Sequence, residues 1–312
     1  MPIVRSLTTM DASAIAELRA RDEFFWLDLH SADDEVVQEL GTLFEFDELA
    51  MEDSREFGQR PKVDDYGDHV LLVYYGMDGR DLVEVHVYIT GQAIITLRRG
   101  HCATLHDAHE RLANVDPQSE EEAIYRVLDA LTDSFLGNLH EIGEEIEDLQ
   151  DEALEYADRD IRVRILALRR RLGAIRRVVV PQRDMFLQAG TALDRLPGLS
   201  GDEAHDYFRD IHDHLIRITD GVESSRDQIS GALDLHASAV SERVNVVTER
   251  LTLISTIFLP LSVVTGFFGM NFGWMVDSIS TQSDFLVFGV GGLVLAGAVL
   301  AVYFSRSGFF KG

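Results

Sequence analysis

Two uncharged stretches near the C-terminus decide the class of this protein: Leu251–Met270, LTLISTIFLPLSVVTGFFGM, and Phe285–Phe304, FLVFGVGGLVLAGAVLAVYF. About twenty apolar residues, at a rise of 1.5 Å each, cross the ~30 Å hydrocarbon core of a bilayer. The alternative is a pair of buried core helices, which is disfavoured because the rest of the chain is densely charged. The sequence therefore predicts two C-terminal transmembrane helices.

Basic residues flank these spans on one side only. Arg243 and Arg250 precede the first span, Arg306 and Lys311 follow the second, and the loop at 271–284 has no Lys or Arg. The positive-inside rule then places the loop outside and both termini in the cytoplasm. Since no signal peptide is recognisable, we expect a multi-pass protein of the cell (inner) membrane.

The overall charge excludes several classes of function. The 312 residues include 28 Lys+Arg and 54 Asp+Glu, a formal net charge of −26. Such an acidic chain lacks the basic faces that nucleic-acid binding needs. The single cysteine, Cys102, excludes an intramolecular disulfide and a four-cysteine zinc site. No catalytic constellation or phosphate-binding loop is visible, so we expect neither an enzyme nor an organic cofactor.

The N-terminal part mixes strand and helix signals. Four runs rich in β-branched and aromatic residues occur between residues 24 and 99, and turn signals such as Asp78-Gly79 separate them. Helical spacing with an acidic face lies between the first two runs, at Asp33–Leu49. This mixture predicts a cytoplasmic α/β domain over residues 1–117. The four runs are FFWLDL, HVLLVYYG, VEVHVYI and AIITLR.

After this domain the signals are helical only. Residues 118–200 begin acidic, and residues 161–183 then contain eight Arg and no acid. An acidic helix packed antiparallel to a basic one explains this inversion better than a binding role for the arginines. We therefore expect a cytoplasmic helical hairpin over 118–200.

A stalk helix is expected to follow the hairpin. Helical spacing runs from Asp202 to Met270, which at 1.5 Å per residue gives a helix of about 100 Å. So long a helix must pack on neighbouring helices or on copies of itself. The fold class expected is an α+β membrane protein. The remaining segments are a stalk at 201–250, a pore-lining span at 251–270, an external loop at 271–284, a second span at 285–304 and a cytoplasmic tail at 305–312.

One face of the stalk and first span is small and polar. Its positions alternate three and four residues apart, so they share one side of the helix. A stripe of this kind in a membrane faces other helices or water rather than lipid. A polar seam between packed helices remains the alternative to a pore lining. The positions are Asn245, Thr248, Thr252, Ser255, Leu259, Ser262 and Gly266.

Neither span contains Asp, Glu, His or Cys. A pore built from these residues cannot strip a divalent cation of its water with carboxylates. It would pass the ion hydrated, in contact with hydroxyl, amide and backbone carbonyl oxygens. Magnesium dehydrates reluctantly and suits such a pore.

The motif Gly269-Met270-Asn271 lies between the two spans, within TIFLPLSVVTGFFGMNF. With this motif in this place, the chain resembles the CorA family of magnesium channels and transporters. The resemblance extends to QRPKVDDYGDHVLLV at 59–73 and FRDIHDHLIRITDGVESSRDQISGALDLHAS at 208–238, and so covers most of the chain.

The resemblance implies a funnel-shaped homopentamer in the lipid membrane whose transported and regulatory cation is Mg²⁺, with Co²⁺ or Ni²⁺ as further cargo. It places Asn271 at the outer pore mouth, where Gly269 and Met270 shape the loop. It adds Leu251 to the pore lining as a hydrophobic constriction. It implies an acidic ring at Asp234, and a regulatory cation site between protomers at Asp210, for which Asp81 is the candidate partner.

Two other functions stay open. A zinc transporter of the ZntB-like branch would share the fold, and a membrane-anchored scaffold or sensor would need the hairpin only as a tether. Two groups of histidines could suggest a zinc site. The spacing of His101, Cys102, His106 and His109 matches no closed zinc site, so we interpret the three histidines as surface residues that follow a strand. We interpret His205, His212 and His214 as solvated helix residues.

Overall fold

The computed structural model describes residues 4–30, 33–114, 117–155, 159–193, 195–196, 202–270 and 272–306. Contacts divide the chain into two compact units, Met1–His236 and Ala237–Gly312. The long helix α7 (Asp202–Phe268) contributes residues to both units. The first unit holds the α/β domain and the long helices that follow it, and the second holds the two apolar helical stretches.

A six-stranded mixed sheet forms the centre of the α/β domain, in the order β1-β2-β6-β5-β4-β3. The pairs β1–β2 and β2–β6 are parallel, and the other neighbours are antiparallel. All four predicted runs are strands. The strands are β1 (Arg5–Leu7), β2 (Phe25–Leu29), β3 (Lys62–Asp65), β4 (His69–Asp78), β5 (Asp81–Thr90) and β6 (Ala93–Arg98).

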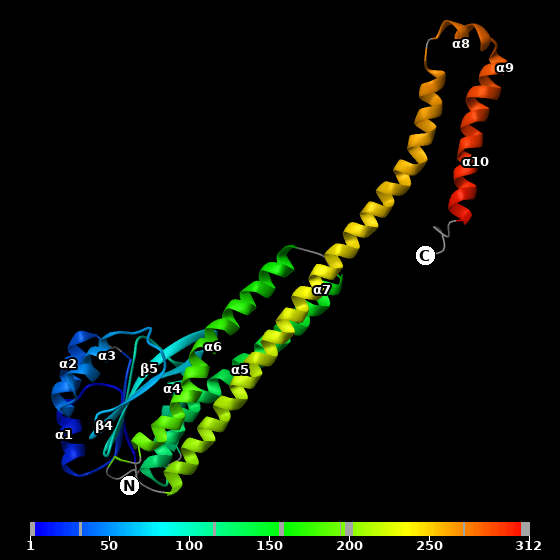
Figure 1. The fold of residues 1–312 in the computed structure, drawn as a ribbon. Helices are drawn as coiled ribbons and strands as arrows, with labels where there is room; N and C mark the ends of the chain where they lie inside the picture. The colour runs from blue at the N-terminus through cyan, green and yellow to red at the C-terminus, as the bar shows by residue number, and fades with distance from the viewer. Residues whose placement is uncertain are drawn as a thin grey trace. The chain divides into compact units, whose positions relative to one another are not determined.

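Helices cover both faces of this sheet (Figure 1). Along β2, Phe25 and Leu27 pack with α1–α3, whereas Trp26 packs with α4 and the helices that follow. This alternation is the two-residue period of a strand buried on both faces. The helices are α1 (Ala12–Ala20), α2 (Asp34–Phe44), α3 (Glu48–Arg55) and α4 (Ala103–Asn114).

The helix predicted over Asp33–Leu49 is two helices in the structure. Asp33 caps α2 through the Val36 amide, and Glu45 then takes a left-handed conformation with φ 57° that ends the helix. Asp47 accepts a hydrogen bond from the Leu49 amide and starts α3. The cap at Asp47 favours a new helix over an extension of α2, because a short Asp side chain accepts hydrogen bonds from the free amides of a first turn.

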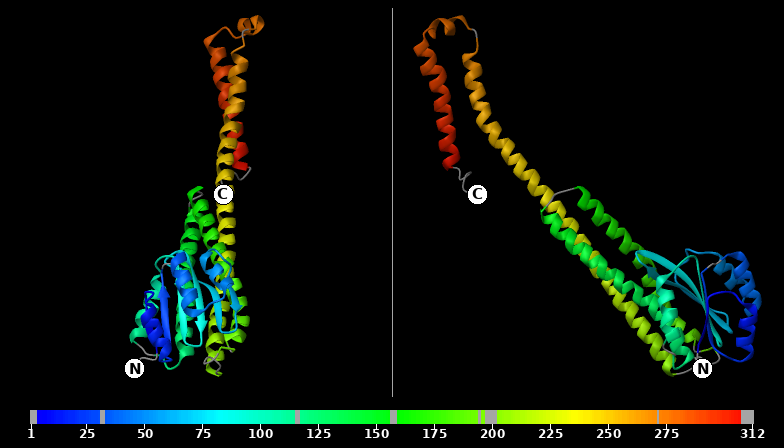
Figure 2. Two further views of the ribbon diagram at one scale, coloured as in Figure 1. Left: turned by 90° about the vertical axis from the view of Figure 1, so that its left-hand side faces the viewer. Right: turned by 180° about the vertical axis from the view of Figure 1, so that it is seen from behind.

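The predicted hairpin is formed by α5 (Glu120–Glu155) and α6 (Arg159–Leu193), which run beside the first part of α7 (Figure 2). Ion pairs join the acidic helix to the basic one, as the charge inversion predicts. Arg164 pairs with Glu152, and Arg171 approaches Glu141 at 3.8 Å. Arg171 is only 15% exposed, but Glu141, Arg164 and Glu152 are 56%, 47% and 41% exposed. Each pair therefore contributes little, and apolar burial holds the hairpin together.

The helix α7 is continuous over 67 residues, as predicted, and ends at Phe268. In the second unit, α8 (Gly273–Ser278) and α9 (Gln282–Asp284) precede a π-helical segment, η1 (Phe285–Val290), and then α10 (Gly291–Arg306). Two helical stretches, His205–Phe268 and Gln282–Arg306, are long and apolar enough to cross a membrane, with mean hydropathy of 2.0 and 2.5 in their most apolar windows.

Candidate functional site

The polar stripe predicted for the pore lies on α7, and in one chain all of its side chains are exposed. Its hydroxyl groups donate to the helix backbone: Thr248 Oγ1 to the Val244 carbonyl, Thr252 Oγ1 to the Thr248 carbonyl and Ser262 Oγ to the Phe258 carbonyl, each at 2.8 Å. With its proton used inside the helix, each hydroxyl presents oxygen lone pairs outwards. The stripe is therefore a row of hydrogen-bond acceptors without charge.

The motif that follows α7 is reached through a tight helix end. The Gly269 amide donates to the Thr265 carbonyl at 3.0 Å, and the Met270 amide donates to the Phe267 carbonyl at 3.3 Å. A Cβ on Gly269 would approach the Thr265 oxygen to 3.3 Å, so a glycine fits best there. Asn271 lies outside the described residues, and its role at the pore mouth stays a prediction.

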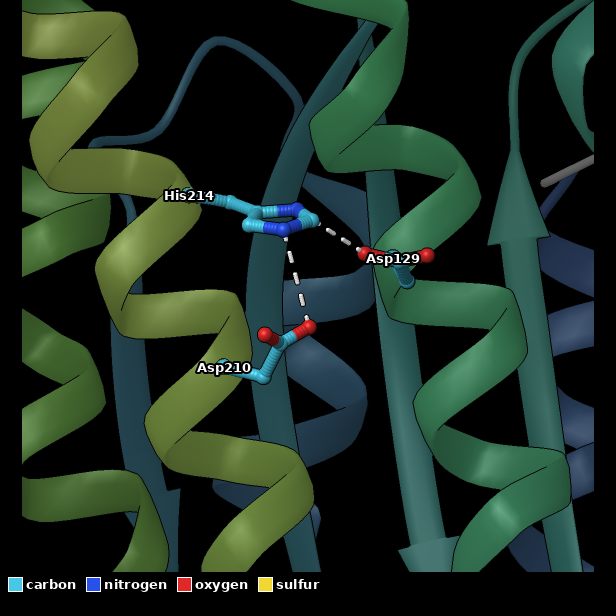
Figure 3. A group of neighbouring side chains, drawn as sticks. All are labelled: Asp129, Asp210 and His214. Carbon is cyan, nitrogen blue, oxygen red and sulfur yellow. Dashed lines mark ion pairs between the residues drawn. The ribbon is translucent and has the colours of Figure 1, made fainter.

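A second site lies in the first unit, where α5 and α7 face each other (Figure 3). Asp129 comes from α5, and Asp210 and His214 come from consecutive turns of α7. One oxygen or nitrogen from each of the three lies within 4.8 Å of the others. His214 Nδ1 is 3.2 Å from both Asp129 Oδ1 and Asp133 Oδ1, and its Nε2 is 3.6 Å from Asp210 Oδ2. We call Asp129, Asp133, Asp210 and His214 the acidic cluster.

The electrostatics of the acidic cluster favour a bound cation. Burial, and then the charge of Asp133, raise the pKa of Asp129 to about 6, against the opposing effect of His214. Asp129 Oδ1 and His214 Nδ1 are both buried without a hydrogen bond of acceptable geometry. Tyr125 occupies one lone pair of Asp210, because its hydroxyl donates to Oδ2 at 2.8 Å. The donor set is thus oxygen-rich, partly unsatisfied and destabilised by its own negative charge.

These donors fit a divalent metal ion. Three carboxylates offer the oxygen ligands that Mg²⁺ prefers, and Mg²⁺ usually completes its shell with water. The imidazole of His214 adds a nitrogen that suits Co²⁺, Ni²⁺ or Zn²⁺ better. Asp129 and His214 were not among the residues predicted for this site, because neither stands out in sequence until α5 and α7 pack together.

The other two acidic candidates lie elsewhere in the first unit. Asp81 opens β5 opposite Asp78, and the adjoining turn is held to α5 where Asn138 donates to the Gly79 carbonyl. Asn138 is nine residues, or about 13 Å, along α5 from Asp129. Asp234 is exposed on α7, 24 residues beyond Asp210. A pairing of Asp210 with Asp81 therefore stays a prediction for contacts between copies.

Two of the histidines that were predicted to be exposed to solvent are partly buried in the structure. His214 is wrong as a solvated residue, because its side chain is only 18% exposed within the acidic cluster. Cys102, which lies next to His101, is fully buried. His109 is wrong as a plain surface residue, since its ring packs on Trp26 with centroids 4.7 Å apart. Hydrophobic contacts of α4 with the sheet, which spacing alone did not reveal, bury Cys102.

Both the family and the relatives of this chain can be recognised from its sequence. The profile of the "CorA-like Mg2+ transporter protein" family matches residues 21–306. This chain belongs to that family. Of its relatives, the "Cobalt/magnesium transport protein CorA" of Thermotoga maritima is 30% identical over 316 residues, covering 97% of this chain and 88% of the relative.

The fold of the CorA-like chain also matches solved structures. The complete structure of the CorA magnesium transporter from Methanocaldococcus jannaschii superposes with a TM-score of 0.79 at 21% identity, covering 91% of this chain and 90% of that one. The zinc transport protein ZntB of Yersinia enterocolitica is 28% identical over 221 residues, covering 69% of this chain and 66% of the relative. The match to ZntB is shorter and less similar than the match to CorA.

Proposed function

We propose that this CorA-like protein is a homopentameric channel in the cell (inner) membrane that admits hydrated Mg²⁺ to the cytoplasm. The observation that carries the proposal is the uncharged acceptor stripe on α7, directly before Gly269-Met270-Asn271. Copies of α7 arranged around an axis would turn their stripes towards a shared path. With both termini cytoplasmic, the loop carrying Asn271 lies at the outer mouth.

The chemistry of the stripe matches a cation that keeps its water. Water bound to Mg²⁺ is a strong hydrogen-bond donor, so the ion's first shell needs acceptors on the pore wall. The stripe offers Thr248, Thr252 and Ser262 oxygens whose protons are already engaged. A membrane potential of 100 mV supplies about 4.6 kcal/mol for a divalent ion entering a negative cell, so no ATP is required.

The acidic cluster supplies the cytoplasmic control of this channel. Asp129 and Asp210 would hold the ion, with Asp133 adding negative charge and His214 adding a nitrogen ligand for softer metals. A bound divalent cation would relieve the repulsion among three carboxylates and fasten α5 to α7. When cytoplasmic Mg²⁺ falls, loss of that fastening favours the open state.

Flux measurements test the channel itself. Purified protein in liposomes should pass Mg²⁺ down a potassium-diffusion potential, and Asn271→Ala should reduce the flux at least tenfold. Gln282→Ala removes an amide from the same loop outside the motif and should leave the flux near that of the unmodified protein. If Asn271→Ala conducts as well as Gln282→Ala, the proposed role of the motif is wrong.

Zinc transport is the second candidate, supported by the similarity to ZntB. The same liposomes can be loaded with a zinc-sensitive dye. Zinc flux in the absence of magnesium flux would show that zinc, and not magnesium, is the transported ion. A failure to conduct any divalent ion would instead favour a membrane-anchored scaffold or sensor.

A further inference from the structure

A cleft of about 740 Å³ lies at one end of the six-stranded sheet, within the first unit. Its walls come from the end of α1, the end of α2, the β3–β4 and β5–β6 turns and the first residue of α5. No residue of the acidic cluster or of the acceptor stripe lines it. Among the described residues, the titratable ones that line the cleft are Arg19, Asp22, Asp68, His69, Glu120 and Arg195.

Contacts between distant segments close the polar side of this cleft. Asp22, which follows α1, accepts a hydrogen bond at Oδ1 from Gln92 Nε2 at 2.5 Å, so the end of α1 meets the β5–β6 turn. Within that turn, the Thr90 hydroxyl accepts from the Gln92 amide at 3.2 Å. Thr90 is in turn the register partner of His69, the first residue of β4. The residues on this side therefore meet through hydrogen bonds and sheet pairing.

Aromatic rings form the other side of the cleft. The His69 ring packs on Phe46, with 4.4 Å between ring centroids, and Phe46 stacks on Phe44 at 5.3 Å. The Arg19 guanidinium carbon lies 5.2 Å from the centroid of the Phe44 ring. Because Arg19 is only three residues before Asp22, these contacts return to the polar side and enclose the cleft.

His69 carries a buried acceptor without a donor. Its side chain is 2% exposed, and its Nδ1 lies 2.7 Å from Asp68 Oδ1. A carboxylate only accepts, so the neutral ring has its proton on Nδ1 and a lone pair on Nε2. Nε2 is buried and has no hydrogen-bond partner among the described residues. Because His69 lines the cleft, an N–H donor on a ligand would satisfy this costly group.

The carboxylates around the cleft also lack donors. The second oxygens of Asp22 and Asp68, and both oxygens of Glu120, have no hydrogen bond or ion pair in the described part of the chain. Burial, and then repulsion from Glu121 and Asp22, raises the pKa of Glu120. Asp22 and Glu120 therefore lie close enough to repel each other, and a cation between them would be stabilised by both.

Two arginines line the cleft, but each is held by a partner. Arg19 Nη1 donates to the Leu43 carbonyl at 2.6 Å, and Arg195 Nη1 pairs with Asp65 Oδ2 at 2.9 Å. An anion in the cleft would have to compete with these partners and would face three carboxylates. The remaining groups are hydrogen-bond acceptors beside aromatic rings, which suits a cation.

We propose that this cleft binds a linear aliphatic diamine or polyamine. One ammonium group would lie between the carboxylates of Glu120 and Asp22. Another would donate to His69 Nε2 beside Asp68, and the methylene chain would pack on the ring of Phe46. An ammonium group has three donors and no acceptor, and aromatic faces attract it. A bare divalent metal ion fits less well, because the aromatic wall offers it no oxygen ligands.

Isothermal titration calorimetry of the full-length protein in a neutral detergent tests this binding. The probe is spermidine, added at physiological ionic strength with millimolar Mg²⁺ present to occupy other acidic sites. We expect one bound spermidine per chain. Glu120→Gln should weaken binding about tenfold, because a hydrogen bond to a charged group is lost. His69→Phe keeps an aromatic ring against Phe46 but removes Nε2, and should weaken binding severalfold.

Glu121→Gln is the matched control, because it removes the same charge from the same turn of α5 although Glu121 does not line the cleft. Its affinity for spermidine should be close to that of the unmodified protein. Equal affinities of the Glu120→Gln and Glu121→Gln variants would overturn the proposal. So would equal binding of 1-aminobutane and 1,4-diaminobutane, which would show that a second ammonium group finds no partner in the cleft.

Discussion

Two half-buried carboxylates, those of Asp129 and Glu84, show how the surroundings of a carboxyl group shift its pKa in opposite directions. Burial and the neighbouring Asp133 raise the pKa of Asp129 to about 6. Burial also acts to raise the pKa of Glu84, but hydrogen bonds from His86, the Gly58 amide and Tyr75 outweigh it and lower the pKa. Glu84 is therefore satisfied by the protein itself, whereas Asp129 gains from an added cation.

Glu84→Gln should destabilise the protein at neutral pH and much less in acid. The pKa of Glu84 is lower in the folded protein than its value of 4.5 in the unfolded chain, so its stabilisation is present above pH 4.5 and is lost as the pH falls through the folded pKa. We expect a loss of about 1–3 kcal/mol at pH 7, since the carboxylate accepts from Tyr75 Oη at 2.9 Å and His86 Nε2 at 3.0 Å. Thermal unfolding in detergent at a series of pH values measures this.

The control for Glu84 is Glu147→Gln, which changes an exposed glutamate of α5. It should alter the unfolding midpoint little at any pH. A loss for Glu84→Gln that is the same at pH 3.5 and pH 7 would show that shape, and not charge, explains the effect.

At the scale of elements, α7 combines a packed first half with an exposed second half. Up to Ala232 its apolar side chains join the core formed with α5 and α6. From Ser241 to Thr252 every residue is exposed in one chain, including Val244 and Leu251. Such a helix has no intramolecular partner for its apolar surface, so other copies and lipid must cover it.

The acceptor stripe predicts a difference between two threonines of α7. Thr252 lies on the stripe and Thr256 lies off it, yet each donates to the carbonyl four residues earlier, at 2.8 Å and 2.7 Å. Thr252→Val should lower Mg²⁺ flux severalfold, because valine keeps the shape but removes the acceptor. Thr256→Val loses the same helical bond and should conduct nearly normally. Equal flux for both variants in liposomes would place the stripe outside the ion path.

The contact between β4 and α5 depends on a small residue. A Cβ on Gly76 would come within 2.8 Å of Leu131 Cδ2 and 3.2 Å of the Leu131 carbonyl oxygen. Gly76→Ala should therefore cost about 1–3 kcal/mol in stability through overpacking. Gly143→Ala, on α5 with no atom within 4 Å of the added methyl, should stabilise by up to about 1 kcal/mol. Thermal unfolding should show shifts of opposite sign, and a stable Gly76→Ala variant would contradict the tight packing.

For the whole molecule, the large negative charge of each chain repels other copies and so opposes assembly. One chain carries −26, so five copies would bring together about −130 formal charges. Even with salt screening, this repulsion disfavours a closed symmetric assembly. Divalent cations at the acidic cluster would offset part of it. If the acidic cluster regulates the channel as proposed, the repulsion between copies would be what the bound cations relieve.

Magnesium should therefore stabilise the assembled protein through the acidic cluster. At a concentration 100-fold above its dissociation constant, a ligand adds about 2.7 kcal/mol per site. We expect Mg²⁺ to raise the thermal midpoint of the unmodified protein, and Asp129→Asn/Asp210→Asn to remove most of that rise. Asp148→Asn/Asp151→Asn neutralises two exposed acids of α5 and should keep it. An equal Mg²⁺ response in both variants would mean that general screening, and not this cluster, binds the ion.

The sequence by itself determined the features that depend on a local repeating pattern. Uncharged stretches of about twenty residues identified the two spans, a three-and-four spacing identified the stripe, and a charge inversion identified the α5–α6 hairpin. These signals are readable because a helix repeats its faces every few residues, whatever it packs against. The strand runs around Trp26 and Tyr74 could be predicted because β-branched and aromatic residues cluster there between turn signals.

Only the tertiary structure decided which distant residues meet. β1 and β3, with three and four residues, are too short to show a period, and they exist because a neighbouring strand pairs with them. Asp129 joined Asp210 and His214 only when α5 packed on α7. Proximity of this kind is set by packing between elements, which leaves no periodic trace in the chain.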